Sequence, residues 1–165
     1  MHLPIKRIPL SNQPDHIAIL EVLEGLRERY SRSPYVWQIA LKLIGRTGNN
    51  AELEHLNKLS QFVREKMIYV KDPEGAEYVT APDVLLHRIA TQGYAQGDCD
   101  DHVLLLNSLL GAVGIEARFV GVMLPTSTKW NHVITQARIK GKWYEVDTCS
   151  KKGTRINYDK VLTII

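Results

Sequence analysis

The sequence predicts an α+β fold, with helices through most of the first two thirds of the chain and an antiparallel sheet after them. Apolar residues recur at helical spacing in three segments before residue 70. A leucine-rich run over residues 103–111 has too few β-branched residues for a strand, so it predicts a buried helix. Residues 116–147 instead alternate between apolar and polar, which is typical of strands. Because the elements are sorted along the chain in this way, the layout is α+β.

The N-terminal part is expected to be mainly helical. Residues 3–10 form a short edge strand or an arm, since two prolines block regular pairing. Helices are expected over residues 13–30, 34–44 and 51–68, each with an apolar stripe. Ser33 is placed to cap the second helix, with a proline at its first position.

The remaining elements follow a stretch with weak signals. Residues 77–96 are expected to be irregular apart from one short helix, Pro82 to Ile89. After them we expect the central helix over residues 99–113, strands over 116–123, 130–139 and 142–147, and a final strand near Ile156.

Length and composition indicate one soluble domain. The 165 residues are enough to form a hydrophobic core without disulfide or metal cross-links. A net charge of +3 without a basic run gives no reason to expect nucleic-acid binding. Two cysteines, Cys99 and Cys149, make neither a disulfide framework nor a four-ligand zinc site. No apolar run reaches membrane-spanning length, so no membrane partner and a cytoplasmic location are expected.

Cys99 lies where a loop of Gly and Asp gives way to the leucine-rich helix. Asp98 is a good N-cap, and Asp101 three residues later makes an approximate capping box. Free N–H groups and the positive end of the helix dipole favour a thiolate there and can hold an oxyanion. We therefore expect a lowered Cys99 pKa, opposed in part by Asp98, Asp100 and Asp101.

The predicted hairpin brings a base and an acid together. With Lys140-Gly141 as a two-residue turn, Ile139 pairs with Lys142, and His132 falls opposite Cys149. His132 and Asp147 are then diagonal neighbours on the non-core face, with Cβ atoms roughly 7 Å apart. A thiol, an imidazole and a carboxylate in this arrangement are what nucleophilic catalysis by cysteine requires.

Three motifs in order resemble the transglutaminase-like core of the papain-like superfamily. They are Gly-Asp-Cys-Asp-Asp at residues 97–101 before the apolar helix, Asn-His-Val at 131–133, and Gly-Lys-Trp-Tyr-Glu-Val-Asp-Thr at 141–148. The resemblance covers about residues 62–148. The N-terminal half more weakly resembles compact bacterial and phage or prophage members, through residues 33–36 and 69–73.

The resemblance implies a nucleophile helix packed on an antiparallel sheet, in a single domain with a helical extension over 1–50 and a catalytic core over 51–165. It makes Cys99 the nucleophile, His132 the base and Asp147 the residue that orients it. The implied activity is hydrolysis or transfer at peptide, isopeptide or glutamine-type amides, on a protein or peptide substrate and without a metal or organic cofactor. The alternative is a catalytically idle assembly protein, with phage or prophage proteins as partners and a place in the virion.

Several assignments stay open. His102 is a rival base, because a side chain at i+3 on a helix leans toward Cys99. Cys149 is a candidate for a reversible disulfide with Cys99. A metal module would use Asp98, Asp100, Asp101 and His102, although this spacing is not an EF-hand. For a second oxyanion donor beside the Cys99 amide the candidates are Gln92, Tyr94, Gln96 and Gln136.

Overall fold

A computed structural model of the chain describes residues 7–10, 16–46, 51–74, 77–125, 127, 131–150, 158 and 160–163. The helices are α1 His16–Ser31, α2 Pro34–Ile44, α3 Glu52–Lys66, α4 Pro82–Gln92 and α5 Cys99–Ala112. The strands are β1 Arg7–Leu10, β2 Met67–Tyr69, β3 Glu77–Thr80, β4 Ala95–Gly97, β5 Glu116–Met123, β6 His132–Ile139, β7 Lys142–Val146 and β8 Lys160–Thr163. The expected α+β class is confirmed.

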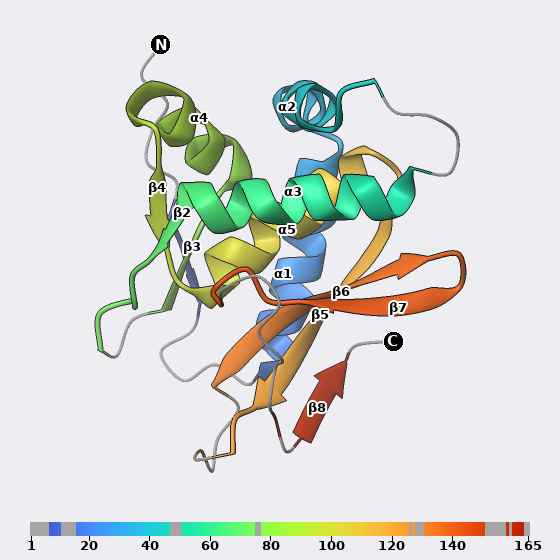
Figure 1. Cartoon of the computed structure of the whole chain (residues 1–165). Helices are drawn as coiled ribbons and strands as arrows, with labels where there is room; N and C mark the ends of the chain where they lie inside the picture. Colours follow the sequence, from blue (N-terminus) through green and yellow to red (C-terminus); the bar gives the residue numbers. More distant parts are fainter. Residues whose placement is uncertain are drawn as a thin grey trace.

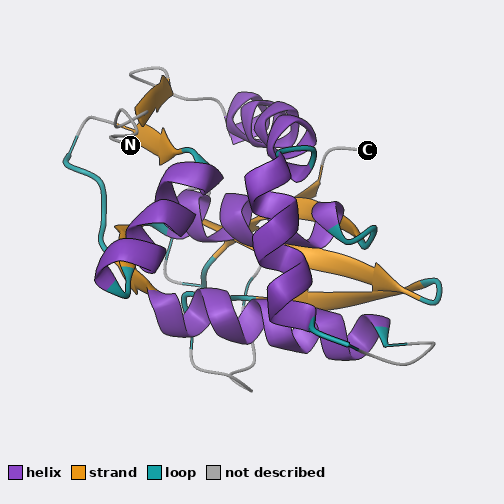
Figure 2. Cartoon of the chain, turned by 90° about the horizontal axis from the view of Figure 1, so that it is seen from above, coloured by secondary structure: helices purple, strands orange, loops and turns teal. Residues whose placement is uncertain are grey.

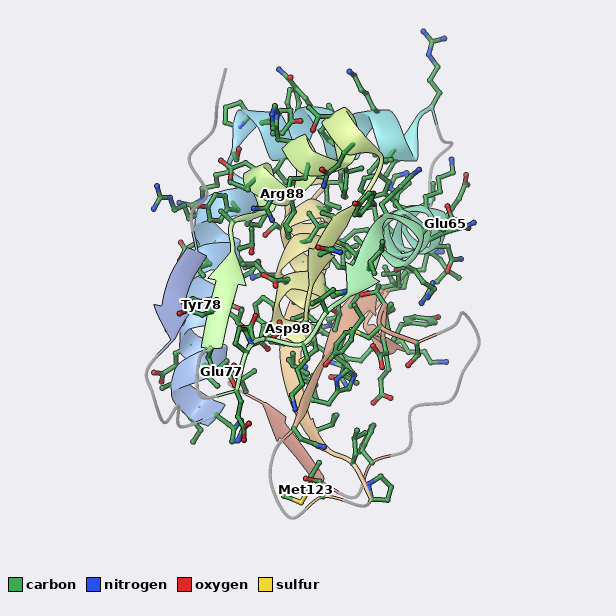
Figure 3. The ribbon with its side chains drawn as sticks, turned by 90° about the vertical axis from the view of Figure 1, so that its left-hand side faces the viewer. Glu65, Glu77, Tyr78, Arg88, Asp98 and Met123 are labelled. Atoms are coloured by element: carbon green, nitrogen blue, oxygen red, sulfur yellow. The ribbon has the colours of Figure 1, made fainter. Side chains whose placement is uncertain are left out.

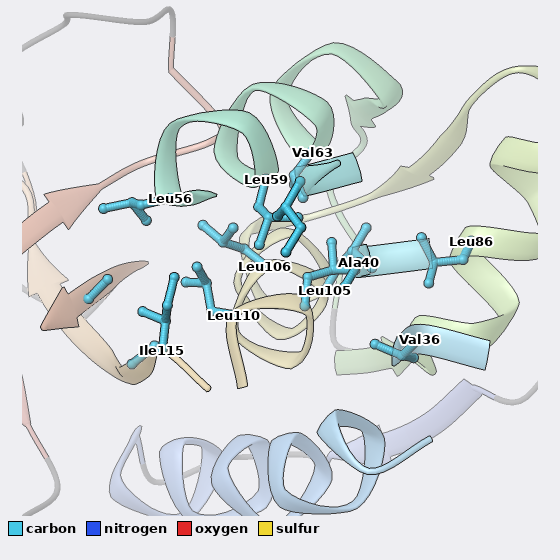
Figure 4. Packing of buried hydrophobic residues seen from close by; sticks show 14 of the residues in the cluster. Val36, Ala40, Leu56, Leu59, Val63, Leu86, Leu105, Leu106, Leu110 and Ile115 are labelled. Atoms are coloured by element: carbon cyan, nitrogen blue, oxygen red, sulfur yellow. The ribbon is translucent and has the colours of Figure 1, made fainter. Parts of the chain in front are cut away.

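Helix α5 is the centre of the fold (Figure 1). It packs against α1, α2 and α3 and against strands β5 and β6. Its five leucines, at positions 104, 105, 106, 109 and 110, have no exposed surface. Figure 4 shows leucines of α5 meeting apolar side chains of α2, α3 and α4. Burial on nearly every side explains why this helix carries no lysine or arginine, because burying an unpaired charge is unfavourable.

The main sheet has four strands in the order β7-β6-β5-β8, all antiparallel. Seen from above, helices lie on both sides of its long hairpin (Figure 2). Two small sheets complete the fold: β1 pairs antiparallel with β3, and β2 pairs parallel with β4. No helix in the described part of the chain is long and apolar enough to span a membrane.

The hairpin prediction is confirmed where β6 and β7 pair. Ile139 pairs with Lys142, and both Lys140 and Gly141 have positive φ, 50° and 80°, as the favoured two-residue turn requires. The ladder ends at Val146, so the predicted pairing of His132 with Cys149 does not form. Asp147 therefore lies in a turn after the strand rather than within it.

The sequence prediction is wrong in three places. The third helix ends at Lys66, because residues 67–69 pair with β4 instead of continuing the helix. The short helix expected from Pro82 is confirmed as α4, although it continues to Gln92, but the rest of residues 77–96 is not irregular, because β3 and β4 flank that helix. The non-core face of β6 is not open at Ile134, which is fully buried beside Val120 and Val122. Residue 156 lies outside the described residues, and the observed last strand is β8.

Candidate active site

A capping box fixes the start of α5 and with it the place of Cys99. Asp98 Oδ1 accepts hydrogen bonds from the N–H groups of Asp100 (3.1 Å) and Asp101 (3.4 Å). Asp101 Oδ2 accepts one from the Asp98 N–H at 3.2 Å, so the predicted box is confirmed. Asp101 Oδ1 also accepts from the Thr80 N–H at 2.6 Å, which ties β3 to the helix start. Cys99 is therefore held rigidly in the first turn.

Gly97 precedes this cap because no larger residue fits. A Cβ atom there would lie 2.4 Å from Asp101 Oδ2. The side chain that closes the capping box occupies the space in question, so the glycine and the box depend on each other.

His132 and Asp147 are hydrogen-bonded. His132 Nε2 lies 2.9 Å from Asp147 Oδ2, which also accepts a hydrogen bond from the Ser150 hydroxyl at 2.9 Å. Asp147 Oδ1 accepts from the Cys149 N–H at 2.9 Å. Burial alone would raise the pKa of Asp147, but these hydrogen bonds and the imidazole outweigh it and hold the pKa below its ordinary value. With Nε2 directed at an ionised carboxylate, Nδ1 of His132 is left for another partner.

Cys99 and His132 line one cavity of about 350 Å³. Tyr69 and Asn131 also line it, and one wall is acidic, with Asp72, Glu77, Asp98 and Asp100. Asp147 lies behind His132, at the Nε2 side of the imidazole. The structure thus brings the three residues singled out from the sequence to one place.

The electrostatics of Cys99 differ from the expectation. Burial, followed by the charges of Asp100 and Asp98, raises the pKa of the thiol well above its ordinary value, and the Val133 N–H opposes this only in part. The sulfur donates a hydrogen bond to Asp100 Oδ1 at 3.8 Å, which further favours the protonated form. The expected lowering was wrong because the carboxylates that begin the helix lie close to the sulfur.

The carboxyl groups at the start of α5 hold protons unusually well. Burial is the main cause: it raises the pKa of Asp98 to about 8, of Asp100 to about 7 and of Asp101 to about 6. Asp98 and Glu77 are labelled beside this helix start in Figure 3. Repulsion between neighbouring carboxylates adds to the effect of burial at Asp98.

A possible cation site is present, but it is not the one that the sequence suggested. Carboxylate oxygens of Asp72, Glu77 and Asp98 lie within 4.8 Å of one another, a grouping of hard oxygen ligands. Among the metal ligands suggested from the sequence, the Asp101 carboxylate accepts hydrogen bonds from backbone N–H groups, and the His102 ring contacts Thr148 instead of a cation site.

His102 is buried rather than poised as a base. Its side chain is 1% exposed, Nδ1 lies 3.3 Å from Thr148 Oγ1, and Nε2 has no partner among the described residues. Burial lowers its pKa to about 4, with His132 adding to the effect and Asp147 opposing it. Cys149 and Cys99 are both free thiols, so the disulfide stays a prediction.

The candidates for the second oxyanion donor do not line the Cys99 cavity. Gln92, Tyr94 and Gln96 are exposed, and Gln136 is hydrogen-bonded to Arg118 and Glu145 on the sheet. The structure brings Tyr69 there instead, a residue that the sequence analysis missed. None of the described residues hydrogen-bonds to its hydroxyl, whose pKa burial raises to about 12, with Cys99 and neighbouring carboxylates contributing.

Comparison with known proteins supports the same fold. The family model of the Transglutaminase-like superfamily matches residues 39–148. A crystal structure named as a putative protease from Parabacteroides distasonis aligns with a TM-score of 0.61 and 19% identity, over 98% of this chain and 39% of that one. A putative cysteine protease from Cytophaga hutchinsonii aligns with a TM-score of 0.54 and 17% identity, over 87% of this chain and 48% of that one.

These likenesses extend to the fold alone, because both identities are low. This chain spans less than half the length of either solved structure. No curated protein matches it. Neither of these structures is described as a phage protein, so the resemblance to phage members stays a prediction.

Proposed function

The chain belongs to the transglutaminase-like superfamily, and we propose that within it this protein acts as a cysteine-dependent enzyme on peptide, isopeptide or glutamine-type amides. Cys99 is the nucleophile, His132 the general base and acid, and Asp147 the residue that orients the imidazole. The substrate is a protein or peptide.

One observation carries this proposal: His132 is hydrogen-bonded to Asp147 at 2.9 Å, and it lines the same cavity as Cys99. The carboxylate fixes the imidazole with Nε2 toward Asp147. Nδ1 is then the nitrogen available to the cavity, and a basic nitrogen beside a thiol is the arrangement that activates a cysteine.

The reaction begins with a protonated thiol. Because the pKa of Cys99 is raised, His132 removes the proton as the sulfur attacks the carbonyl carbon, rather than forming an ion pair beforehand. The tetrahedral intermediate collapses when the His132 imidazolium gives its proton to the leaving amine. A thioester remains, and water or a second amine attacks it with His132 again as the base. Hydrolysis or transamidation results, and the thiol is restored.

The developing oxyanion needs donors that are already in place. The Cys99 N–H in the first turn of α5 supplies one, and we assign the other to the Tyr69 hydroxyl. Tyr69 lines the cavity with Cys99, and its pKa of about 12 keeps the hydroxyl protonated at any working pH. An uncharged donor at this place stabilises the intermediate more than the planar carbonyl, which is what lowers the barrier.

The test uses an acyl donor that needs no cognate substrate. In a Cys149→Ser background, p-nitrophenyl acetate acylates Cys99 with a burst of nitrophenolate. We expect a burst in this parent protein, none in Cys99→Ala, and an acylation rate at least about tenfold lower in His132→Ala. His87→Ala is the matched control, because His87 lies on α4 and does not line the Cys99 cavity. Equal acylation rates with and without His132 would show that the site is idle and overturn the proposal.

A further inference from the structure

The turn that carries Asp147 lies beyond the last paired residue of β7, and its link to the sheet is the hydrogen bond of Asp147 to His132 at the start of β6. β7 ends at Val146, and the hydrogen bonds of the Asp147 carboxylate to Cys149 and Ser150 lie within the turn itself. Those bonds fix the carboxylate relative to its own turn. Contacts with the rest of the protein must set the distance between this turn and the nucleophile.

Besides His132, two side chains anchor the turn from outside. Arg64 on α3 donates to the carbonyl oxygens of Ser150 (2.9 Å) and Asp147 (3.3 Å). His102 on α5 approaches the hydroxyl of Thr148 at 3.3 Å. His102 stands one helical turn after Cys99, so this contact joins the helix of the nucleophile directly to the residue that follows the triad acid.

The Nε2 atom of His102 adds nothing to the stability of the folded protein. His102 is 1% exposed, and its Nε2 is buried with no partner in the described part of the chain. A buried polar atom without a partner is unfavourable, and an apolar side chain would avoid that penalty. The favourable polar contact of the ring is the one with Thr148. Tyr69 packs beside the same ring, with centroids 6.3 Å apart.

We infer that His102 is a positioning residue, which holds Thr148 and thereby keeps the Asp147 carboxylate in line with His132. This inference rests on the proposed function, since it gives His102 no contact with the substrate. His102 stays neutral in the role, so it places no second cation beside Asp147. A shift of the turn by about 1 Å would misdirect the imidazole, and misplacement of that size lowers rates by up to about a hundredfold.

The test compares three variants in the Cys149→Ser background with p-nitrophenyl acetate. We expect His102→Leu and Thr148→Val each to slow acylation of Cys99 by about tenfold to a hundredfold, and the double variant to be no slower than either. His102→Asn, whose amide can occupy the place of Nδ1, should recover most of the rate. Thr91→Val, which alters an exposed threonine on α4 that does not line the Cys99 cavity, is the matched control.

Two further measurements separate positioning from a structural role. The urea midpoint of His102→Leu should stay close to that of the parent, because the substitution removes an unpartnered buried nitrogen but also leaves the buried Thr148 hydroxyl without its ring partner. In a His132→Ala background, His102→Leu should change the rate by less than about twofold, since it acts through that imidazole.

The inference is overturned if His102→Leu is acylated at a rate within twofold of the parent, or if it still slows acylation in the His132→Ala background. It is also overturned if the urea midpoint of His102→Leu falls so far that loss of folded protein accounts for the slower acylation. Failure of the proposed function is distinct, because there the parent and His132→Ala would already react alike.

Discussion

Asp100 is the charge that most strongly opposes ionisation of Cys99, and replacing it with asparagine tests the electrostatics of the site. Its Oδ1 lies 3.8 Å from the sulfur. At an effective dielectric constant of about 20, two unit charges at this distance interact by about 4 kcal/mol, which corresponds to about three pKa units. The repulsion exists only while Asp100 is ionised, and burial raises the pKa of Asp100 to about 7.

The sign and the pH window follow from that value. Below pH 6 the parent protein carries a proton on Asp100, so Asp100→Asn changes little. Above pH 7 the parent is ionised there and the variant is not, so the thiol pKa is lower in the variant. With a three-unit interaction, the thiolate fraction of the variant exceeds that of the parent about twofold at pH 7 and about tenfold at pH 8.

Alkylation by iodoacetamide reports the thiolate fraction, and intact mass follows the single thiol in a Cys149→Ser background. The rate constants of Asp100→Asn and the parent are compared from pH 6 to 9. Asp83→Asn is the matched control, since Asp83 stands in the first turn of α4 and does not line the Cys99 cavity. A ratio that stays constant across this range, or falls below one, would refute the assigned repulsion.

Further predictions concern the same site and the core. Gly97→Ala should lower stability by about 1–2 kcal/mol in urea unfolding, because its Cβ displaces Asp101 from the capping box, whereas Gly25→Ala, with nothing within 4 Å, should raise it by about 0.5–1 kcal/mol. Thr135→Val should stabilise by about 1 kcal/mol, since its buried hydroxyl has no partner among the described residues. Tyr69→Phe should slow acylation by p-nitrophenyl acetate about a hundredfold with an unchanged melting temperature. The melting temperature should fall from pH 5 to 8, because the raised pKa values of the carboxyl groups at the start of α5 make the folded state bind more protons than the unfolded chain in this window; a rise would contradict those shifts.

The parts of the site that the sequence predicts are those with local rules. The length of a hairpin turn sets its register, so the closeness of His132 and Asp147 follows from counting outward from Lys140-Gly141. The helix start at Cys99 follows from the spacing of Asp98 and Asp101. Both were confirmed, although the ladder stops one residue before Asp147.

The parts that were missed depend on contacts between distant segments. β2 and β4 have three residues each and pair across an intervening helix, so neither shows a periodicity of its own. Tyr69 reaches the cavity only because of that pairing. The contact between His102 and Thr148 joins α5 to a turn 46 residues later, and no sequence pattern within either segment predicts this contact.

The raised pKa of Cys99 has the same origin as the helix that presents it. Asp98 caps α5, and Asp100 follows in the first turn, so the carboxylates near the helix start also oppose a thiolate. Dipole stabilisation at a helix start therefore does not decide the ionisation of a cysteine when the first turn is acidic and buried. A thiol kept protonated reacts slowly with oxidants and alkylating agents, because the thiolate is the nucleophile. The reactivity of Cys99 then depends on a base directed at its sulfur. The reaction rate therefore depends on the alignment of His132 by Asp147 and on the alignment of Asp147 by His102.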